Sequence, residues 1–68
     1  MKSISGKKFA KLLESKSWIL LRVNGSHYIY GKSGVVQRIS VPIHGNKALK
    51  IGLLRHFLKV SGISEDEL

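Results

Sequence analysis

The 68-residue sequence predicts a small α+β domain with the element order helix, strand, strand, strand, helix. Apolar residues recur at helical spacing near both ends, alternate with polar residues through the centre, and are separated there by turn residues. Both helices can cover one face of a three-stranded antiparallel sheet, which leaves the other face open to solvent or a ligand. A chain of this length is expected to form a single domain, residues 1–68.

The first helix is expected from Gly6 to Lys16. Ser5 precedes it and can cap the free N–H groups of the first turn. The predicted buried side consists of Phe9, Leu12 and Leu13. Lysines occupy the opposite side and the first turn, where the helix dipole favours negative charge. They either serve another purpose, such as binding, or only solvate the outer face.

The centre of the chain predicts a meander of three strands, at Trp18–Val23, Ser26–Tyr30 and Val35–Val41. Asn24-Gly25 is a strong hairpin signal because both central residues of the favoured turn need a positive φ. A second turn is expected at Gly31–Gly34, and Pro42 ends the third strand. The first strand is expected to place three apolar residues on one side: Ile19, Leu21 and Val23.

A second amphipathic helix is predicted from the spacing of Leu49, Leu53, Phe57 and Val60. Gly62 is expected to end it in the left-handed conformation, with Ile63 folding back onto the last turn. Ser64 and Glu67 can cap a final short turn. Gly52 costs this helix about 1 kcal/mol relative to Ala, which predicts close packing against the sheet or a partner.

The charge is strongly positive and unevenly distributed. The chain has 12 Lys and Arg against 4 acids, a net charge of +8, and Glu14 is the only acid before residue 65. A polyanion is the expected partner because neutralising phosphates releases condensed counterions; the alternative is a merely soluble basic protein. Without cysteine there is no disulfide framework or thiolate nucleophile, so a cytoplasmic protein without membrane contact is expected.

The titratable residues favour chemistry that needs no metal or other cofactor. One helix glutamate and an acidic end are too few carboxylates for two-metal phosphoryl transfer. His27, His44 and His56 show no short metal-ligand spacing. RNA can supply its own nucleophile, the 2′-hydroxyl, if a base takes its proton, and histidine is suited to that role near neutral pH. Composition does not choose among the three histidines.

Basic and aromatic side chains are the candidate RNA contacts. RNA affinity would rest on Lys7, Lys11, Arg22, Arg38, Lys47, Lys50 and Lys59. Tyr28 and Tyr30 either stack on bases or belong to the core. Trp18, at the junction of helix and strand, is expected in the core.

Four motifs in order resemble one known family: Gly25-Ser26-His27-Tyr28-Ile29-Tyr30, Ser40-Val41-Pro42-Ile43-His44-Gly45, Leu49-Lys50-Ile51-Gly52-Leu53-Leu54-Arg55 and Ser61-Gly62-Ile63-Ser64. They are similar to the HicA, or YcfA-like, toxins of bacterial toxin-antitoxin systems. The resemblance covers nearly the whole chain. It implies a fold like the double-stranded RNA-binding domain, cleavage of mRNA that arrests growth, and inhibition by a HicB-type antitoxin.

The resemblance also assigns roles to individual residues. It makes His27 of the Gly-Ser-His motif the catalytic histidine, which we expect to act as general base, or as acid in the return step. Ser26, beside it in the same motif, is a further candidate RNA contact, and His44 is given a role in loop structure or RNA contact. We expect the antitoxin to be acidic and to cover the His27 surface. Two other functions stay open: a non-catalytic RNA-binding module of the same fold, and a protein-interaction module whose basic surface only receives an acidic partner.

Overall fold

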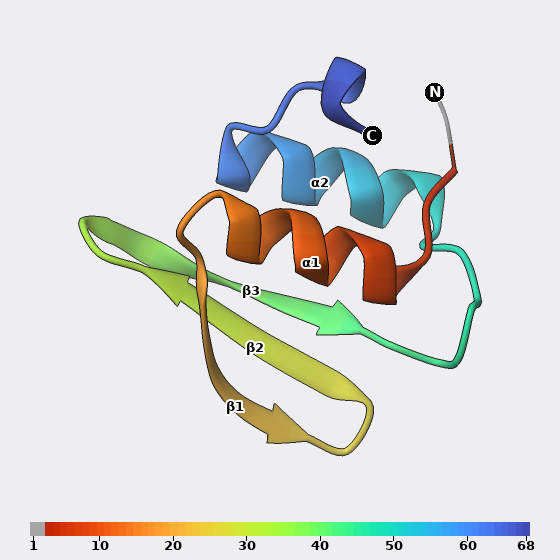
Figure 1. Ribbon diagram of the computed structural model, residues 1–68, viewed down its shortest axis with the longest axis horizontal. Helices are drawn as coiled ribbons and strands as arrows, with labels where there is room; N and C mark the ends of the chain where they lie inside the picture. Colours follow the sequence, from red (N-terminus) through yellow and green to blue (C-terminus); the bar gives the residue numbers. More distant parts are fainter. Residues whose placement is uncertain (1–2) are drawn as a thin grey trace.

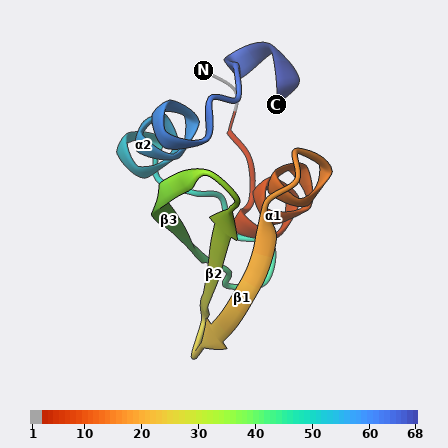
Figure 2. The ribbon, with the colours of Figure 1, turned by 90° about the vertical axis from the view of Figure 1, so that its left-hand side faces the viewer.

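The structure, a computed structural model, describes residues 3–68 and has the predicted order of elements (Figure 1). The elements are α1 (Gly6–Ser15), β1 (Ile19–Asn24), β2 (His27–Lys32), β3 (Val35–Pro42), α2 (Ile51–Ser61) and the short 3-10 helix η1 (Glu65–Glu67). Both α-helices lie on one face of a three-stranded sheet, and the β1–β2 hairpin extends beyond them (Figure 2). The α+β class and the arrangement in two layers are therefore confirmed.

Helix α1 begins at the predicted residue and ends one residue earlier than predicted. The Ser5 hydroxyl accepts a hydrogen bond from the Lys8 N–H at 3.2 Å, which is the expected N-cap. Phe9 and Leu13 are fully buried, whereas Leu12 is only half-buried. The first turn contains no acid, so its lysines oppose the helix dipole as the sequence indicated.

The strands pair in the order β1-β2-β3, and both pairs are antiparallel. Asn24 pairs with His27, which leaves Gly25 and Ser26 as the two turn residues. Gly25 has a φ of +62°, but neither Asn24 nor Ser26 has a positive φ. The predicted hairpin is confirmed and the predicted turn geometry is wrong: a glycine at the first central position is typical of a type II′ turn, which needs one positive φ rather than two.

A β-bulge in β1 breaks the predicted alternation of side chains. The register passes from Leu20 opposite Tyr30 to Arg22 opposite Ile29, so Leu21 is an extra residue. A Cβ on Gly31 would contact the far end of the exposed Leu21 side chain, which can move aside, so the bulge places this side chain over Gly31 without requiring glycine there. The expectation that Ile19, Leu21 and Val23 share one side is wrong, because the bulge moves Val23 to the opposite face, where it pairs with Tyr28.

Helix α2 begins at Ile51, two residues after the start predicted from the apolar spacing. Leu49 is buried but lies before the helix, and its N–H donates to the Ile4 carbonyl at 2.8 Å. Its apolar side chain therefore matches the helical spacing while its backbone pairs with the segment before α1. Gly62 ends α2 with a φ of +75°, and Ile63 is buried behind it, as predicted.

The core lies between the helices and the covered face of the sheet. Its buried members are Phe9, Ala10, Leu13, Trp18, Tyr30, Ile39, Val41, Leu49, Leu54, Phe57, Leu58 and Ile63. The Phe9 and Phe57 rings stack with centroids 5.6 Å apart and join α1 to α2. Trp18 is in the core as predicted. Among residues 3–68, no atom outside the adjacent helix backbone lies within 4 Å of the position that a Gly52 Cβ would occupy, so the close packing against the sheet predicted for Gly52 is wrong.

The C-terminal turn η1 is anchored to the end of α1. Glu67 accepts a hydrogen bond from the Ser64 N–H at 3.0 Å, and the Ser64 hydroxyl accepts one from the Asp66 N–H at 3.2 Å. The Glu67 carboxylate also forms an ion pair with Lys16, the C-cap residue of α1. The predicted capping by Ser64 and Glu67 is confirmed.

Candidate nucleic-acid interface

His27 lies on the open face of the sheet, at the end where β2 begins. It pairs with Asn24 of β1 and with Pro42 of β3, and its side chain is exposed. Successive side chains of a strand point to opposite faces. Because Tyr30 is buried beneath the helices and Tyr28 shares its parity, His27 must project from the other face. The sequence left open which face of the sheet carries His27, and the structure places it on the open face.

Two arginines share the open face with His27, and Arg22 is the nearer of them in the strand register. Arg22 is directly opposite Ile29, which is two residues along β2 from His27, and Ser40 of β3 is opposite Ile29 on the other side. Two residues along a strand span about 6.6 Å, a distance that an arginine side chain can cover. Arg38 is exposed on the same face, further along β3. Within residues 3–68 the only ion pair is between Lys16 and Glu67, so no carboxylate neutralises these cations.

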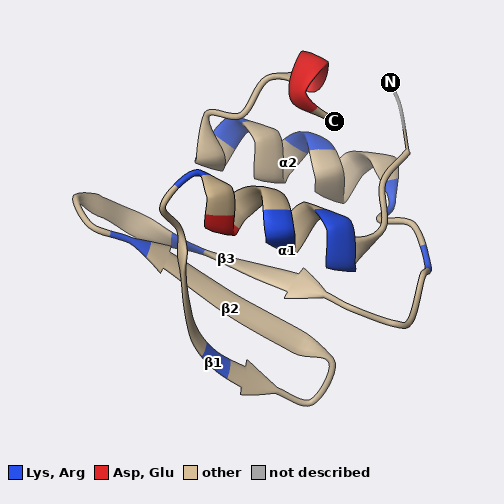
Figure 3. Cartoon of the chain, viewed as in Figure 1, with Lys and Arg blue, Asp and Glu red and all other residues tan. Residues whose placement is uncertain are grey.

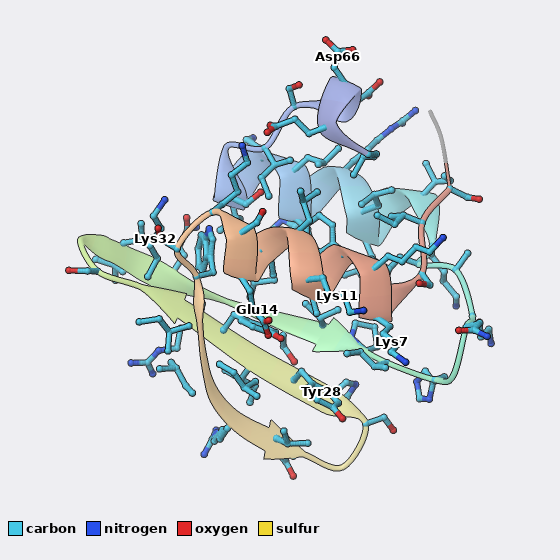
Figure 4. The ribbon with its side chains drawn as sticks, in the orientation of Figure 1. Lys7, Lys11, Glu14, Tyr28, Lys32 and Asp66 are labelled. Atoms are coloured by element: carbon cyan, nitrogen blue, oxygen red, sulfur yellow. The ribbon has the colours of Figure 1, made fainter. Side chains whose placement is uncertain are left out.

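A groove lies on the other side of β2, between this strand, α1 and the loop after β3. Its volume is about 420 Å³, and it is lined by Lys7, Ala10, Lys11, Glu14, Tyr28, Tyr30, Ile43, Gly45 and Asn46. Figure 4 shows the side chains of Lys7, Lys11, Glu14 and Tyr28 gathered in this space. We call it the α1–β2 groove. Its volume falls within the range of about 300–1,000 Å³ that is typical of small-ligand sites.

The two tyrosines of β2 have different environments, which answers the question that the sequence left open. Tyr30 is 1% exposed and belongs to the core, whereas Tyr28 is half-buried on the wall of the α1–β2 groove. The Tyr30 hydroxyl donates to Oε2 of Glu14 at 2.8 Å. Burial, together with this hydrogen bond, raises the pKa of Tyr30 to about 12, so the hydroxyl keeps its proton at neutral pH. Only Tyr28 is available to stack on a base.

The remaining predicted contacts lie in the segment before α2, in the last turn of α2 and in the turn before β2. His44, Lys47 and Lys50 line a second hollow of about 340 Å³ together with Pro42 and Leu53. Lys59 lies in the last turn of α2, nine residues after Lys50, or about 13 Å further along the helix axis. Ser26, in the turn before β2, accepts a hydrogen bond from the Ile43 N–H at 2.8 Å through its backbone carbonyl.

The predicted RNA contacts therefore form separate groups rather than one patch. Lys7, Lys11 and Tyr28 line the α1–β2 groove, Arg22 and Arg38 lie on the open sheet face with His27, and His44, Lys47 and Lys50 surround the second hollow. Lys59 is apart from all three. Figure 3 shows basic residues on both helices, the sheet and the loop before α2, with the acids at the C-terminal end gathered in η1.

Sequence patterns did not mark the other residues of the groove as contacts: Ala10, Glu14, Ile43, Gly45 and Asn46. One signal was available for Glu14, because it is the only acid among the first 64 residues of a strongly basic chain. Ile43 and Gly45 fall within one of the four family motifs, whereas no signal in the sequence marks Asn46, which the fold of the loop brings to the groove.

The described part of the chain has neither a cluster of metal ligands nor a membrane-spanning helix. Within the described residues 3–68, no three His, Asp or Glu side chains are close enough to hold a metal ion together. Nor does this part of the chain contain a helix with the length and hydropathy that crossing a membrane requires.

The fold and the surface define the class of protein: a small α-β-β-β-α domain that carries an exposed histidine on its open sheet face and, within residues 3–68, many cations without an ion pair. Residues 6–63 match the family model described as "HicA toxin of bacterial toxin-antitoxin", so the chain belongs to the HicA toxin family and is the toxin of a toxin-antitoxin system. The family resemblance drawn from the four motifs is thus confirmed. A search of curated proteins found no match.

Proposed function

We propose that this toxin is an endoribonuclease that cleaves mRNA without a metal ion, with His27 as the general base. The observation that carries the proposal is the position of His27: an exposed imidazole on the open sheet face, inside the Gly-Ser-His motif, with Arg22 in the adjacent row. The family to which the chain belongs supports a toxic activity, and its basic surface supports a polyanionic substrate.

The proposed reaction uses the 2′-hydroxyl of the RNA as nucleophile. A ring nitrogen of His27 accepts the proton of this hydroxyl while its oxygen attacks the adjacent phosphorus. The bond from phosphorus to the 5′-oxygen breaks, and this oxygen takes up a proton as it leaves. The products are a 2′,3′-cyclic phosphate and a 5′-hydroxyl end. Arg22 would stabilise the negative charge that develops on the phosphate oxygens.

The test compares the purified protein with His27→Ala on a defined single-stranded RNA in excess EDTA. His56→Ala is the matched control, because His56 is also exposed but lies on α2, away from the open sheet face. We expect the protein and the control to cut with cyclic-phosphate ends, and His27→Ala to be slower by about 10²–10⁴-fold, the usual contribution of a general base. Equal cleavage by His27→Ala would exclude His27 as the base.

A second result would favour the binding alternative. If neither the protein nor His27→Ala cleaves RNA while both bind it, the chain acts as an RNA-binding module. If neither binds RNA at low salt, the protein-interaction alternative gains support, because a cationic surface that serves phosphates must bind most strongly there.

We propose further that the toxin is neutralised by an acidic HicB-type antitoxin that covers His27. The toxin's excess of basic residues supports an acidic partner, and membership of the family implies a cognate antitoxin. In the complex, chemical modification of histidines should be suppressed at His27 and retained at His56. A complex that inhibits cleavage while His27 stays reactive would contradict simple masking.

A further inference from the structure

The α1–β2 groove contains a carboxylate that an RNA-binding surface would not be expected to have. Glu14 is exposed, yet it lines a groove whose other charged residues are Lys7 and Lys11. A carboxylate repels phosphate, so a site that served the RNA backbone alone would be weaker for its presence. Its partners in a nucleotide are hydrogen-bond donors, either the ribose hydroxyls or the N–H groups of a base, and only the N–H groups differ from one base to another.

The Glu14 carboxylate is positioned by the core. The Tyr30 hydroxyl donates to Oε2 at 2.8 Å, and Tyr30 is itself 1% exposed, so the anchor is rigid. Since this hydroxyl keeps its proton at neutral pH, it remains a donor and leaves lone pairs of both carboxylate oxygens free. Within residues 3–68 no Lys or Arg forms an ion pair with Glu14.

The other groove residues can contact the phosphate and the base of a nucleotide. Lys7 and Lys11 are four residues apart on α1, hence on one side of the helix, where both can meet phosphates. Tyr28 presents a half-buried ring on the strand wall, and such rings stack on bases of any sequence. Cations, an aromatic ring and an anchored acceptor therefore line the same space of about 420 Å³.

We infer that the α1–β2 groove binds one nucleotide of the RNA substrate and that Glu14 selects a base with an exocyclic amino group against uracil. Guanine, adenine and cytosine each present an amino donor on the Watson–Crick edge, and a carboxylate can only accept. Uracil presents one N–H between two carbonyl oxygens, and these oxygens repel the carboxylate. This inference rests on the proposed function, since it assigns sequence preference to the same RNA substrate.

The selected base is not that of the nucleotide whose 2′-hydroxyl reacts. His27 and Tyr28 are consecutive in β2, so their side chains project from opposite faces of the sheet. The Ile43 N–H donates a hydrogen bond of 2.8 Å to the Ser26 carbonyl. This bond joins the segment after β3 to the turn before β2, at the end of the sheet that lies between the two faces. RNA that occupies both sites passes around this end, and the base in the groove flanks the cut.

The test is the base preference of Glu14→Gln. The amide oxygen of the new side chain can still accept from Tyr30, while its NH₂ group can donate to a uracil carbonyl. Cut sites are sequenced from an RNA library with random bases around one cleavable position. We expect the unmodified protein to favour amino-bearing bases over uracil about 10-fold at one flanking position, the scale of one good contact to a base, and Glu14→Gln to reduce this ratio towards 1.

A control variant separates the possible failures. Glu65→Gln removes an exposed acid on η1, away from the groove, and should keep the preference. Cleavage by the unmodified protein with no uracil discrimination at any flanking position, or an unchanged preference in Glu14→Gln, overturns the inference and leaves the proposed function standing.

A binding experiment tests the inference even where no cleavage occurs. Short fluorescent oligo-A and oligo-U are titrated with His27→Ala and with the double variant that also carries Glu14→Gln. We expect His27→Ala to bind oligo-A about 10-fold more tightly than oligo-U, and the double variant to lose this difference. Equal affinities of His27→Ala for the two RNAs overturn the inference.

Discussion

Two glycines in helices predict opposite effects of the same substitution. Gly6 is the first residue of α1, and a Cβ there would collide with the backbone carbonyl oxygen of Pro42. Gly52 is the second residue of α2, and a Cβ there would meet no atom within 4 Å. Gly6→Ala is therefore expected to destabilise the protein, and Gly52→Ala to stabilise it.

The expected changes in unfolding free energy follow from the space available for a Cβ at each glycine. Gly52→Ala reduces the freedom of the unfolded chain at no steric cost, which is worth about 0.4–1 kcal/mol. The same gain is available to Gly6→Ala, but forcing an atom against a fixed carbonyl costs about 1–3 kcal/mol. With about 4–8 °C per kcal/mol for a domain of this size, Tm should rise by about 2–8 °C for Gly52→Ala. From the middle of both ranges, the net cost of Gly6→Ala is about 1.3 kcal/mol, so its Tm should fall by roughly 5–10 °C.

Thermal and urea unfolding followed by far-UV circular dichroism measure both changes. RNA cleavage should fall further in Gly6→Ala than the loss of folded protein explains, because the displaced residue, Pro42, pairs with His27. Gly6→Ala with unchanged or raised stability would refute the close approach of α1 to β3. Loss of stability in Gly52→Ala would show that the Gly52 surface is in contact with another group.

Three further substitutions test the packing and the C-terminal turn. Tyr30→Phe keeps the buried ring but loses the hydrogen bond to Glu14, so urea unfolding should show a loss of about 0.5–1.5 kcal/mol; no loss would mean that water replaces Glu14. Leu13→Ala empties a fully buried position, and a calorimetric scan should show a loss of about 2–5 kcal/mol, unless the core collapses to fill the space. The hydrogen bond to Lys16 lowers the pKa of Glu67 from its ordinary value of 4.5, so its stabilisation is present above about pH 4.5 and is lost as the pH falls through the lowered folded-state pKa. The difference in unfolding free energy between the protein and Glu67→Gln should vanish in acid, and a difference that persists at pH 2 would contradict this assignment.

Hydrophobic spacing was sufficient to predict the order of elements, because each helix and strand buries a regular set of side chains. It could not predict the bulge at Leu21, since the apolar run from Trp18 to Leu21 contains no alternation that fixes a face. Nor could it exclude Leu49 from α2. A buried leucine satisfies the helical spacing whether its own backbone is helical or, as here, paired with the segment before α1.

The residue types of the candidate site could be predicted, but not their arrangement. Local sequence cannot decide which face of β2 carries His27, because a shift of one residue exchanges the faces. The burial of Tyr30 fixes it. Whether Lys7 and Arg22 converge depends on how α1 sits on the sheet, and the structure places these residues in different groups. Glu14 was visible in the sequence as an isolated acid, but its bond to Tyr30 depends on contacts between distant segments.

The acidic turn η1 lies beyond the helices, on the far side from the sheet (Figures 1 and 3). Its anchoring by Glu67 to the end of α1 fixes this negative end relative to the basic remainder of the molecule. The toxin is therefore an electric dipole. In the field of a polyanion, such a molecule rotates before contact, so that the groove and the sheet arrive first and η1 points away. Salt would slow this oriented capture through screening, even where the final contacts are unchanged.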